Sequence, residues 1–371
     1  MGGDEVSGGA ALVAHVRDQA RSCAAQGSAV YGVLLDRVAD DVEAGGPAAV
    51  VVAGHEHDPR DSALALRLAG AVHRVVLEGR APRLAAHYPS TGGDGDATAA
   101  WPAFRAVLAD HAEEVREALQ RAPQTNEVGR CAALWPAVLR ASLTAGAGAG
   151  AGAALPVRLW EVGTSAGLNL RADAYRYQVG TGPRAPGWGP PASPVVLDPA
   201  WEQAPPWLAA APAQLDVVER VGADPHLLDP ASERDATTLA SYVWPDQLDR
   251  LARLRGALAV ARRVPVRAVR TTAAELLDGL ELSTGVLTVV QHSVVRQYLS
   301  ASEQQHVEAR LQDLGARASA ERPLAHVAVE PRRLAPGEDV AFWVVLRTWP
   351  GGEEEVLGEA RPHGVPVRWG R

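Results

Sequence analysis

The spacing of hydrophobic residues changes once along the chain, at a run of small residues between 145 and 154. Before this run, in residues 1–144, hydrophobic residues such as Leu64 and Leu68 recur every three or four positions, the spacing of one helix face. After it, in residues 155–371, short hydrophobic runs alternate with amphipathic stretches. The run itself alternates alanine with glycine, and we interpret it as a flexible linker. The sequence therefore predicts an all-helical N-terminal domain, a linker and an α/β domain.

The α/β domain is predicted to contain a mostly parallel sheet with helices on both faces. Its hydrophobic runs of strand length lie at residues 157–162, 215–221, 264–269, 285–290, 324–329 and 341–346. Amphipathic stretches separate several of these runs, which is typical of strand–helix–strand units. The end of the chain differs, because residues 342–349 and 354–360 flank a Pro-Gly-Gly turn and are expected to pair as an antiparallel hairpin, with residues 364–369 as an extra strand.

The composition limits the partners that we expect. The formal net charge is −8 and there is no run of basic residues, so nucleic acid is not an expected partner. No hydrophobic run reaches the roughly 18 residues of a membrane span, and the first ten residues lack a signal-peptide pattern, so we expect a cytoplasmic protein. Neither the two cysteines nor His55 and His57 show metal-ligand spacing with a third ligand, and no metal site is predicted. The sequence does not indicate an oligomeric state.

A glycine-containing loop after the first predicted strand is the strongest candidate for a binding site. The strand ends at Glu161, and a turn with Gly163 and Gly167 leads into a predicted helix. Glycines let the backbone approach a ligand closely, and the N–H groups at a helix start can bind its polar atoms. The alternative is that the glycines only allow the helix to pack closely on the strand.

This loop resembles the first motif of class I S-adenosylmethionine-dependent methyltransferases, in which an acid precedes glycines at alternate positions. Ser165 stands where the middle glycine is usual. The resemblance implies a class I methyltransferase-like (Rossmann-like) sheet and S-adenosylmethionine as the cofactor. The cofactor would contact Glu161, Gly163, Ser165, Gly167 and Asn169. The G-x-G-x-x-G spacing of dinucleotide-binding proteins is absent, which disfavours a nicotinamide-dependent oxidoreductase.

Three further cofactor-binding candidates follow in the order that the resemblance implies. Asp224 comes after the second strand, where an acid in such proteins holds the ribose hydroxyls. It could equally be a turn residue before Pro225, and Asp198, in a Pro-rich insertion at residues 178–213, competes for the role. Thr272 follows the third strand and Gln291 ends the fourth.

Candidate catalytic and substrate-binding residues lie after the fourth strand and before the first. His292 is a candidate general base, with Tyr298 as a second catalytic candidate and Gln297 as a substrate contact. The alternative for His292 is a histidine at the edge of the core. A polar group at the start of an otherwise hydrophobic helix is expected at a domain junction, where it would bind substrate, and consists of Asn126, Glu127 and Arg130. Arg130 would suit a substrate carboxylate, whereas Asn126 could simply cap the helix.

Stretches along the whole chain also resemble a poorly characterised protein family of GC-rich bacteria. These stretches lie between about Tyr31 and Trp369 and include residues 124–127, 161–170, 243–247, 292–295, 349–352 and 362–364. The resemblance supports one shared fold and implies no known activity.

Together, the sequence predicts an S-adenosylmethionine-dependent transferase that acts on a small molecule. The same cofactor site could serve another alkyl transfer or a cyclisation. The alternative is a non-catalytic nucleotide-binding or scaffold protein on a degenerate methyltransferase fold, which the serine at position 165 favours.

Overall fold

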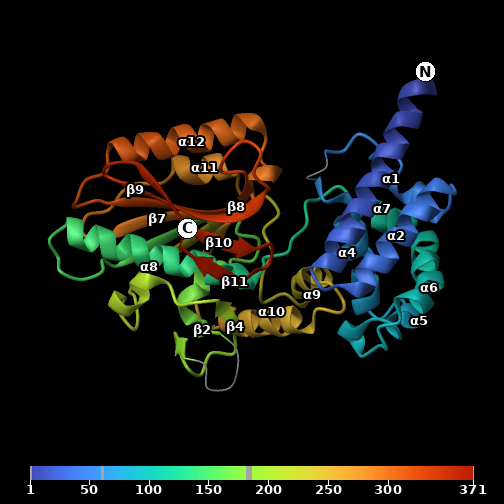
Figure 1. The fold of residues 1–371 in the computed structure, drawn as a ribbon, viewed down its shortest axis with the longest axis horizontal. Helices are drawn as coiled ribbons and strands as arrows, with labels where there is room; N and C mark the ends of the chain where they lie inside the picture. Colours follow the sequence, from blue (N-terminus) through green and yellow to red (C-terminus); the bar gives the residue numbers. More distant parts are fainter. Residues whose placement is uncertain (1, 60–61, 181–185, 371) are drawn as a thin grey trace. The chain divides into compact units, whose positions relative to one another are not determined.

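The computed structural model describes residues 2–59, 62–180 and 186–370, which form two compact units (Figure 1). The first unit consists of Met1–Thr125 and Glu233–Ala252, and the second of Asn126–Ser232 and Arg253–Arg371. The division therefore differs from the predicted domain boundary at residues 145–154. The chain leaves the first unit earlier, and it returns to that unit for a second segment.

The alanine–glycine run is not a free linker over its whole length. Helix α8 (Cys131–Gly148) belongs to the second unit and continues through the first four residues of the run. The chain then turns back, so that a Cβ on Gly146 would lie 1.8 Å from the carbonyl oxygen of Ala153. Glycine at position 146 thus permits a close backbone contact, which a sequence pattern of small residues does not distinguish from flexibility.

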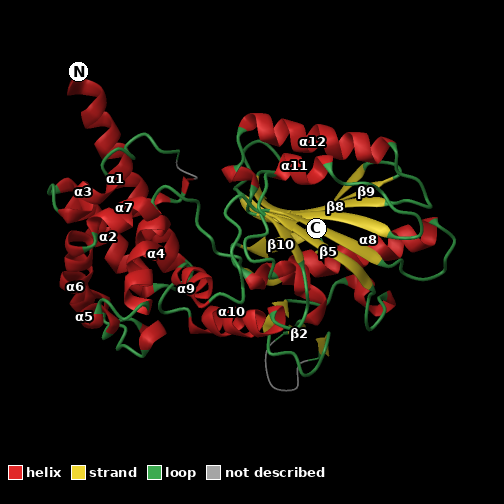
Figure 2. Cartoon of the chain, turned by 180° about the vertical axis from the view of Figure 1, so that it is seen from behind, coloured by secondary structure: helices red, strands yellow, loops and turns green. Residues whose placement is uncertain are grey.

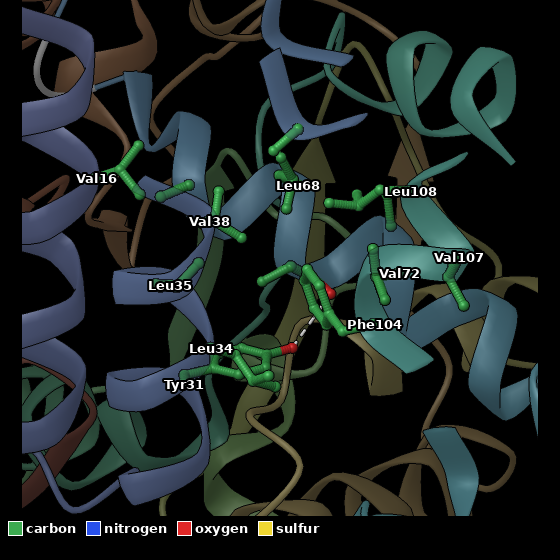
Figure 3. Packing of buried hydrophobic residues seen from close by; sticks show 14 of the residues in the cluster. Val16, Tyr31, Leu34, Leu35, Val38, Leu68, Val72, Phe104, Val107 and Leu108 are labelled. Carbon is green, nitrogen blue, oxygen red and sulfur yellow. Dashed lines mark hydrogen bonds between the residues drawn. The ribbon is translucent and has the colours of Figure 1, made fainter. Parts of the chain in front are cut away.

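The first unit is helical, as the sequence predicts for the N-terminal region. Its α-helices are α1 (Gly2–Ala25), α2 (Ala29–Glu43), α3 (Pro47–Val52), α4 (Leu64–Leu77), α5 (Pro82–Ala85), α6 (Ala97–Asp110), α7 (Ala112–Ala118) and α9 (Glu233–Ser241). Figure 3 shows how side chains of α2, α4 and α6 meet in one hydrophobic core. Within it, the hydroxyl of Tyr31 donates a hydrogen bond to the carbonyl of Ala69 at 3.2 Å.

The second segment completes this helical unit. Trp244 is 5% exposed, belongs to the same core and lies against Tyr31, with 6.3 Å between ring centroids. Asp246 accepts hydrogen bonds from the hydroxyl of Ser28 at 2.6 Å and from the backbone N–H of Val30 at 3.0 Å. Because the first N–H groups of a helix have no partner inside it, Asp246 caps α2 from a distant part of the sequence. Helix α10 (Leu248–Ala261) then carries the chain into the second unit.

The second unit is built on a mixed, mostly parallel sheet of eleven strands within the described residues (Figure 2). The order is β3-β2-β4-β11-β10-β9-β8-β7-β1-β5-β6. The strands are β1 (Val157–Val162), β2 (Arg176–Val179), β3 (Gly187–Trp188), β4 (Val196–Trp201), β5 (Val217–Ala223), β6 (Arg267–Val269), β7 (Leu287–Ser293), β8 (Leu324–Arg332), β9 (Ala341–Trp349), β10 (Glu353–Arg361) and β11 (Gly364–Trp369). The α/β class, the mostly parallel sheet and the antiparallel C-terminal hairpin are thus confirmed, and a class I methyltransferase fold stays a prediction.

Five neighbouring strands of this sheet, β6-β5-β1-β7-β8, are all parallel. From β1 the chain adds β5 and β6 on one side, and it then crosses to add β7 and β8 on the other. This is the order of a doubly wound sheet, which changes direction between β1 and β7. Helices α11 (Ala273–Asp278) and α12 (Ala301–Ala316) pack on one face, and α8 packs against β7, β8 and β9 (Figure 1). Ligands of such sheets bind beyond the carboxyl ends of the strands at this change of direction.

The capping role of Asp246 predicts that the two segments of the first unit stabilise each other. Replacing Asp246 with alanine removes two hydrogen bonds at the start of α2, and we expect the free energy of unfolding to fall by about 1–2 kcal/mol. Urea unfolding followed by circular dichroism, with limited proteolysis to locate cleavage in α2, measures the effect. The control is Asp249→Ala, which changes an exposed acid on α10. Equal stability of the two variants would contradict the capping role.

Candidate functional site

The carboxyl ends of β1, β5, β7 and β8 carry a concentration of buried polar side chains. Glu161, Asp224 and Gln291 come from three of these strands and are 2%, 7% and 1% exposed. Buried polar groups are stable only when they are hydrogen-bonded, so each of them needs partners in the structure.

The turn after β1 is strongly bent. Gly163 has a φ of 66°, Ser165 of 52° and Gly167 of 69°, all in the left-handed region that favours glycine. The helix that follows is a short 3-10 helix, η4 (Asn169–Ala174), and not the α-helix that the motif leads one to expect. Ser165 therefore occupies a strained conformation where the resembling motif has glycine.

Two side chains hold this turn through its backbone N–H groups. Asn126 Oδ1 accepts hydrogen bonds from the N–H of Ala166 at 3.2 Å and of Leu168 at 3.1 Å. Asp224 Oδ2 accepts from the N–H of Ser165 at 3.0 Å. The side chains of Asn126 and Asp224 thus occupy backbone N–H groups that a ligand bound at the turn would otherwise use. The sequence could not reveal these contacts of Asn126, because Asn126 lies far from the turn along the chain.

The glycines of the turn lie against side chains of the protein. A Cβ on Gly163 would lie 2.5 Å from Val295 Cγ2, and one on Gly167 would lie 3.3 Å from a guanidinium nitrogen of Arg171. Val295 follows β7 directly after Val294, whose φ of 53° is strained for a β-branched residue. The segment after β7 thus covers the turn after β1.

Glu161 is held between β1 and its neighbour β7. Its Oε2 accepts from the hydroxyl of Thr164 at 2.6 Å, and its Oε1 accepts from the amide of Gln291 at 3.3 Å. Burial raises the pKa of Glu161 to about 8, although both hydrogen bonds act in the opposite direction. A carboxyl group with a perturbed pKa at the carboxyl edge of a parallel sheet marks a candidate functional site.

Asp224 lies closer to the turn than its competitor. Its Oδ1 accepts from the backbone N–H of His226 at 2.8 Å, so the carboxylate also shapes its own turn before Pro225. Asp198 lies on β4, and five strands lie between β4 and β1 in the sheet order. Asp198 is therefore not the acid beside the glycine turn.

Asn169 and Thr272 have contacts inside the protein. Asn169 is 3% exposed, and its Oδ1 accepts from the thiol of Cys131 at 3.2 Å. Thr272 is the N-cap of α11, where its hydroxyl accepts from the backbone N–H of Glu275 at 3.2 Å. Both residues stay cofactor-binding predictions, but these contacts give each of them a structural role as well.

His292 forms a dyad with Glu330, a residue that the sequence analysis missed. The distance between His292 Nδ1 and Glu330 Oε1 is 2.7 Å, and the two side chains are 14% and 11% exposed. Glu330 lies on β8, one residue beyond Val329, which pairs with the end of β7. An acid directly after the predicted strand at residues 324–329 is the sequence pattern that could have identified it.

The other predicted residues after β7 lie on the short helix η6 (Arg296–Tyr298). Tyr298 is 37% exposed. Gln297 lies beside it on the same turn. Their predicted roles rest on the sequence alone.

The predicted substrate-binding group belongs to the second unit and lies at the same edge of the sheet. Glu127 caps the 3-10 helix η3 (Val128–Arg130) by accepting from the N–H of Gly129 at 3.0 Å. Arg130 donates to the carbonyl of Ser293 at 3.4 Å and to that of Pro362 at 3.3 Å. It therefore joins the end of β7 to the turn between β10 and β11.

Some classes of site find no support in the described part of the chain. No group of three or more His, Cys, Asp or Glu side chains there could hold a metal ion. None of the helices there is both long and hydrophobic enough to cross a bilayer.

The fold and site define an α/β protein whose doubly wound half carries a buried polar cluster where the strand order changes direction. The family model described as "Uncharacterized protein conserved in bacteria (DUF2332)" matches residues 13–369, and the chain belongs to this family. No curated protein and no solved structure matches the chain.

The raised pKa of Glu161 predicts how the stability of the protein depends on pH. The unfolded chain loses this proton near pH 4.5 and the folded protein near pH 8, so Glu161 makes the wild type less stable as the pH rises between these values. The substitution Glu161→Gln replaces the titrating carboxyl group with an amide that does not titrate. Between pH 4.5 and 8 the free energy of unfolding of this variant, relative to that of the wild type, should therefore rise by up to about 1 kcal/mol per pH unit. Urea unfolding at pH 5, 6.5 and 8 measures this. A constant difference between the two proteins at all three values would show that Glu161 does not titrate in this range.

Proposed function

We propose that this protein is an S-adenosylmethionine-dependent transferase acting on a small molecule, with its active site at the carboxyl ends of β1 and β7. One observation carries the proposal: the glycine turn after β1 lies where the strand order changes direction, Val295 from the segment after β7 covers it, and the His292–Glu330 dyad lies on β7 and β8 at the same edge of the sheet. Doubly wound sheets bind their ligands at this position.

The residues around the turn fit the proposed cofactor in two respects. Gly163 and Gly167 keep Cβ atoms out of the turn, and Glu161 and Asp224 offer carboxyl groups at the ends of neighbouring strands. The oxygens of these carboxyl groups can accept hydrogen bonds from the ribose hydroxyls and the amino group of S-adenosylmethionine. In a third respect the fit requires movement, because Val295 lies against Gly163 and must turn away for a ligand to reach the backbone there.

The chemistry that we assign to the protein itself is proton transfer and positioning. When bound, S-adenosylmethionine would supply an electrophilic methyl or alkyl group. His292 would take the proton from the substrate O–H or N–H that becomes the nucleophile. Arg130, which lies on η3 and donates to Ser293 at the end of β7, would hold a substrate carboxylate and so fix the orientation of the substrate.

A second candidate function has its own supporting observation. Asn126 and Asp224 already satisfy three backbone N–H groups of the turn, and Val295 covers Gly163. A turn whose N–H groups already bond to side chains of the protein suits a binding or scaffold protein that keeps the fold but does not catalyse the reaction. This function would show binding of a nucleotide-like ligand, or none, and no transfer.

Calorimetry tests the cofactor. We expect S-adenosylmethionine and S-adenosylhomocysteine to bind the wild type with dissociation constants below the millimolar range. Val295→Ala removes methyl groups that stand against Gly163, so it should tighten binding by roughly threefold or more, the scale of one buried methyl group.

The matched control is Val307→Ala, which removes the same groups from α12, where Val307 packs on the same hydrophobic cluster as Val295. It should leave both affinities unchanged. If neither compound binds the wild type at millimolar concentration, the cofactor proposal is wrong. If both valine variants bind like the wild type, the cofactor does not lie against Gly163.

His292→Ala tests the reaction. We expect formation of S-adenosylhomocysteine from S-adenosylmethionine, in the presence of a fractionated bacterial metabolite extract, to fall by roughly 100-fold. Affinity for S-adenosylmethionine should stay within about twofold, because the imidazole acts on the substrate. Undiminished product formation in this variant would exclude His292 as the base.

A further inference from the structure

Glu330 on β8 makes three contacts with the end of β7 and the segment after it. Its Oε1 lies 2.7 Å from His292 Nδ1, and it also accepts from the backbone N–H of Val295 at 2.9 Å. The N–H of Arg296 approaches the same oxygen at 3.4 Å. One carboxylate oxygen on β8 therefore holds both the imidazole at the end of β7 and the backbone of the segment that follows.

The carboxylate of Glu330 is ionised at neutral pH. Burial alone would raise its pKa, but the hydrogen bond and charge of His292 and the two backbone N–H groups outweigh burial, and the pKa is lowered from its usual value. An ionised carboxylate only accepts hydrogen bonds, so His292 Nδ1 must carry the proton that it donates. Whenever the imidazole is neutral, its lone pair is therefore on Nε2.

His326 on β8 lies beside the dyad, and the arginine charges that act on it are Arg347 on β9 and Arg296 on η6. The rings of His326 and His292 are 5.0 Å apart, and His326 Nε2 is buried with no hydrogen-bond partner among the described residues. Burial, followed by the charges of His292, Arg347 and Arg296, lowers the pKa of His326 well below its usual value. His326 is thus neutral, and Glu330 is the negative charge in direct contact with His292.

We propose that Glu330 is a positioning residue that fixes His292 as the Nδ1–H tautomer and presents the lone pair of Nε2 as the proton acceptor of the site. The proposal rests on the function proposed for His292. When His292 takes a proton, the carboxylate stabilises the resulting imidazolium, and the proton later leaves from the same Nε2. By binding the N–H of Val295, Glu330 also fixes the segment over the glycine turn.

The tautomer can be measured in the full chain without any ligand. Long-range proton–nitrogen NMR spectra of protein labelled with ¹⁵N-histidine distinguish Nδ1–H from Nε2–H imidazole, and the spectrum of His292→Asn identifies the His292 signals. At pH 8 we expect the Nδ1–H form of His292 to exceed the Nε2–H form at least tenfold in the wild type, roughly the ratio that a hydrogen bond to a charged group maintains. A dominant Nε2–H form in the wild type overturns the proposal.

Two variants test whether Glu330 causes this preference. Glu330→Ala removes the acceptor, and Glu330→Asp withdraws it by one methylene group while keeping the charge. In each folded variant the excess of Nδ1–H should fall at least threefold, and more in the alanine variant. The aspartate variant decides the test if the alanine variant does not fold.

The matched control is Glu219→Ala. Glu219 lies on β5, and its carboxylate accepts from Arg158 and Trp160 instead of a histidine. It should leave the His292 tautomer unchanged. If the Glu330 variants keep the wild-type ratio, Glu330 does not set the tautomer. If the tautomer follows Glu330 but S-adenosylmethionine does not bind, the cofactor proposal fails while the dyad stands.

Discussion

The second unit depends on the hydrogen bonding of one turn. After β1 the backbone passes through three left-handed residues within five positions, and its N–H groups point into a region where most side chains are buried. An unpaired buried N–H costs about 1–3 kcal/mol, so several acceptors must converge on the turn. Asn126, from before α8, and Asp224, from the end of β5, provide them. The turn thereby joins the start of α8 to the neighbouring strand.

The same requirement explains why the polar residues cluster at one edge of the sheet. Glu161 is accommodated in its buried position by Thr164 and Gln291, and Glu330 is accommodated by His292 and the backbone after β7. The two buried carboxyl groups differ in their pKa. Glu161 has a raised pKa, whereas Glu330 has a lowered one because it accepts from a histidine and two amides. Two acids whose pKa values move apart are what the proposed acid–base role would require.

The periodicity of the sequence was sufficient to predict much of the fold. The runs at residues 157–162 and 324–329 became β1 and most of β8, and the two sides of the Pro-Gly-Gly turn became β9 and β10, because alternation and turn residues act locally. Long-range contacts were not predictable in the same way. Asn126 looked like a substrate contact or a helix cap, and only the folded chain shows that it holds a turn 40 residues away. The alanine–glycine run was predicted to be a flexible linker, but its first four residues belong to α8. The pattern is ambiguous because small residues permit close packing as well as flexibility.

The return of the chain to the helical unit has a consequence for synthesis on the ribosome. Helices α1 to α7 emerge first, but α9, Trp244 and Asp246 emerge only after β1 to β5 have been made. Until then the start of α2 lacks its distant cap, and the hydrophobic surface that Trp244 later covers stays open. Domains generally fold as units, and exposed hydrophobic surface promotes aggregation. The core of the helical unit can therefore be completed only after the first strands of the other unit have left the ribosome.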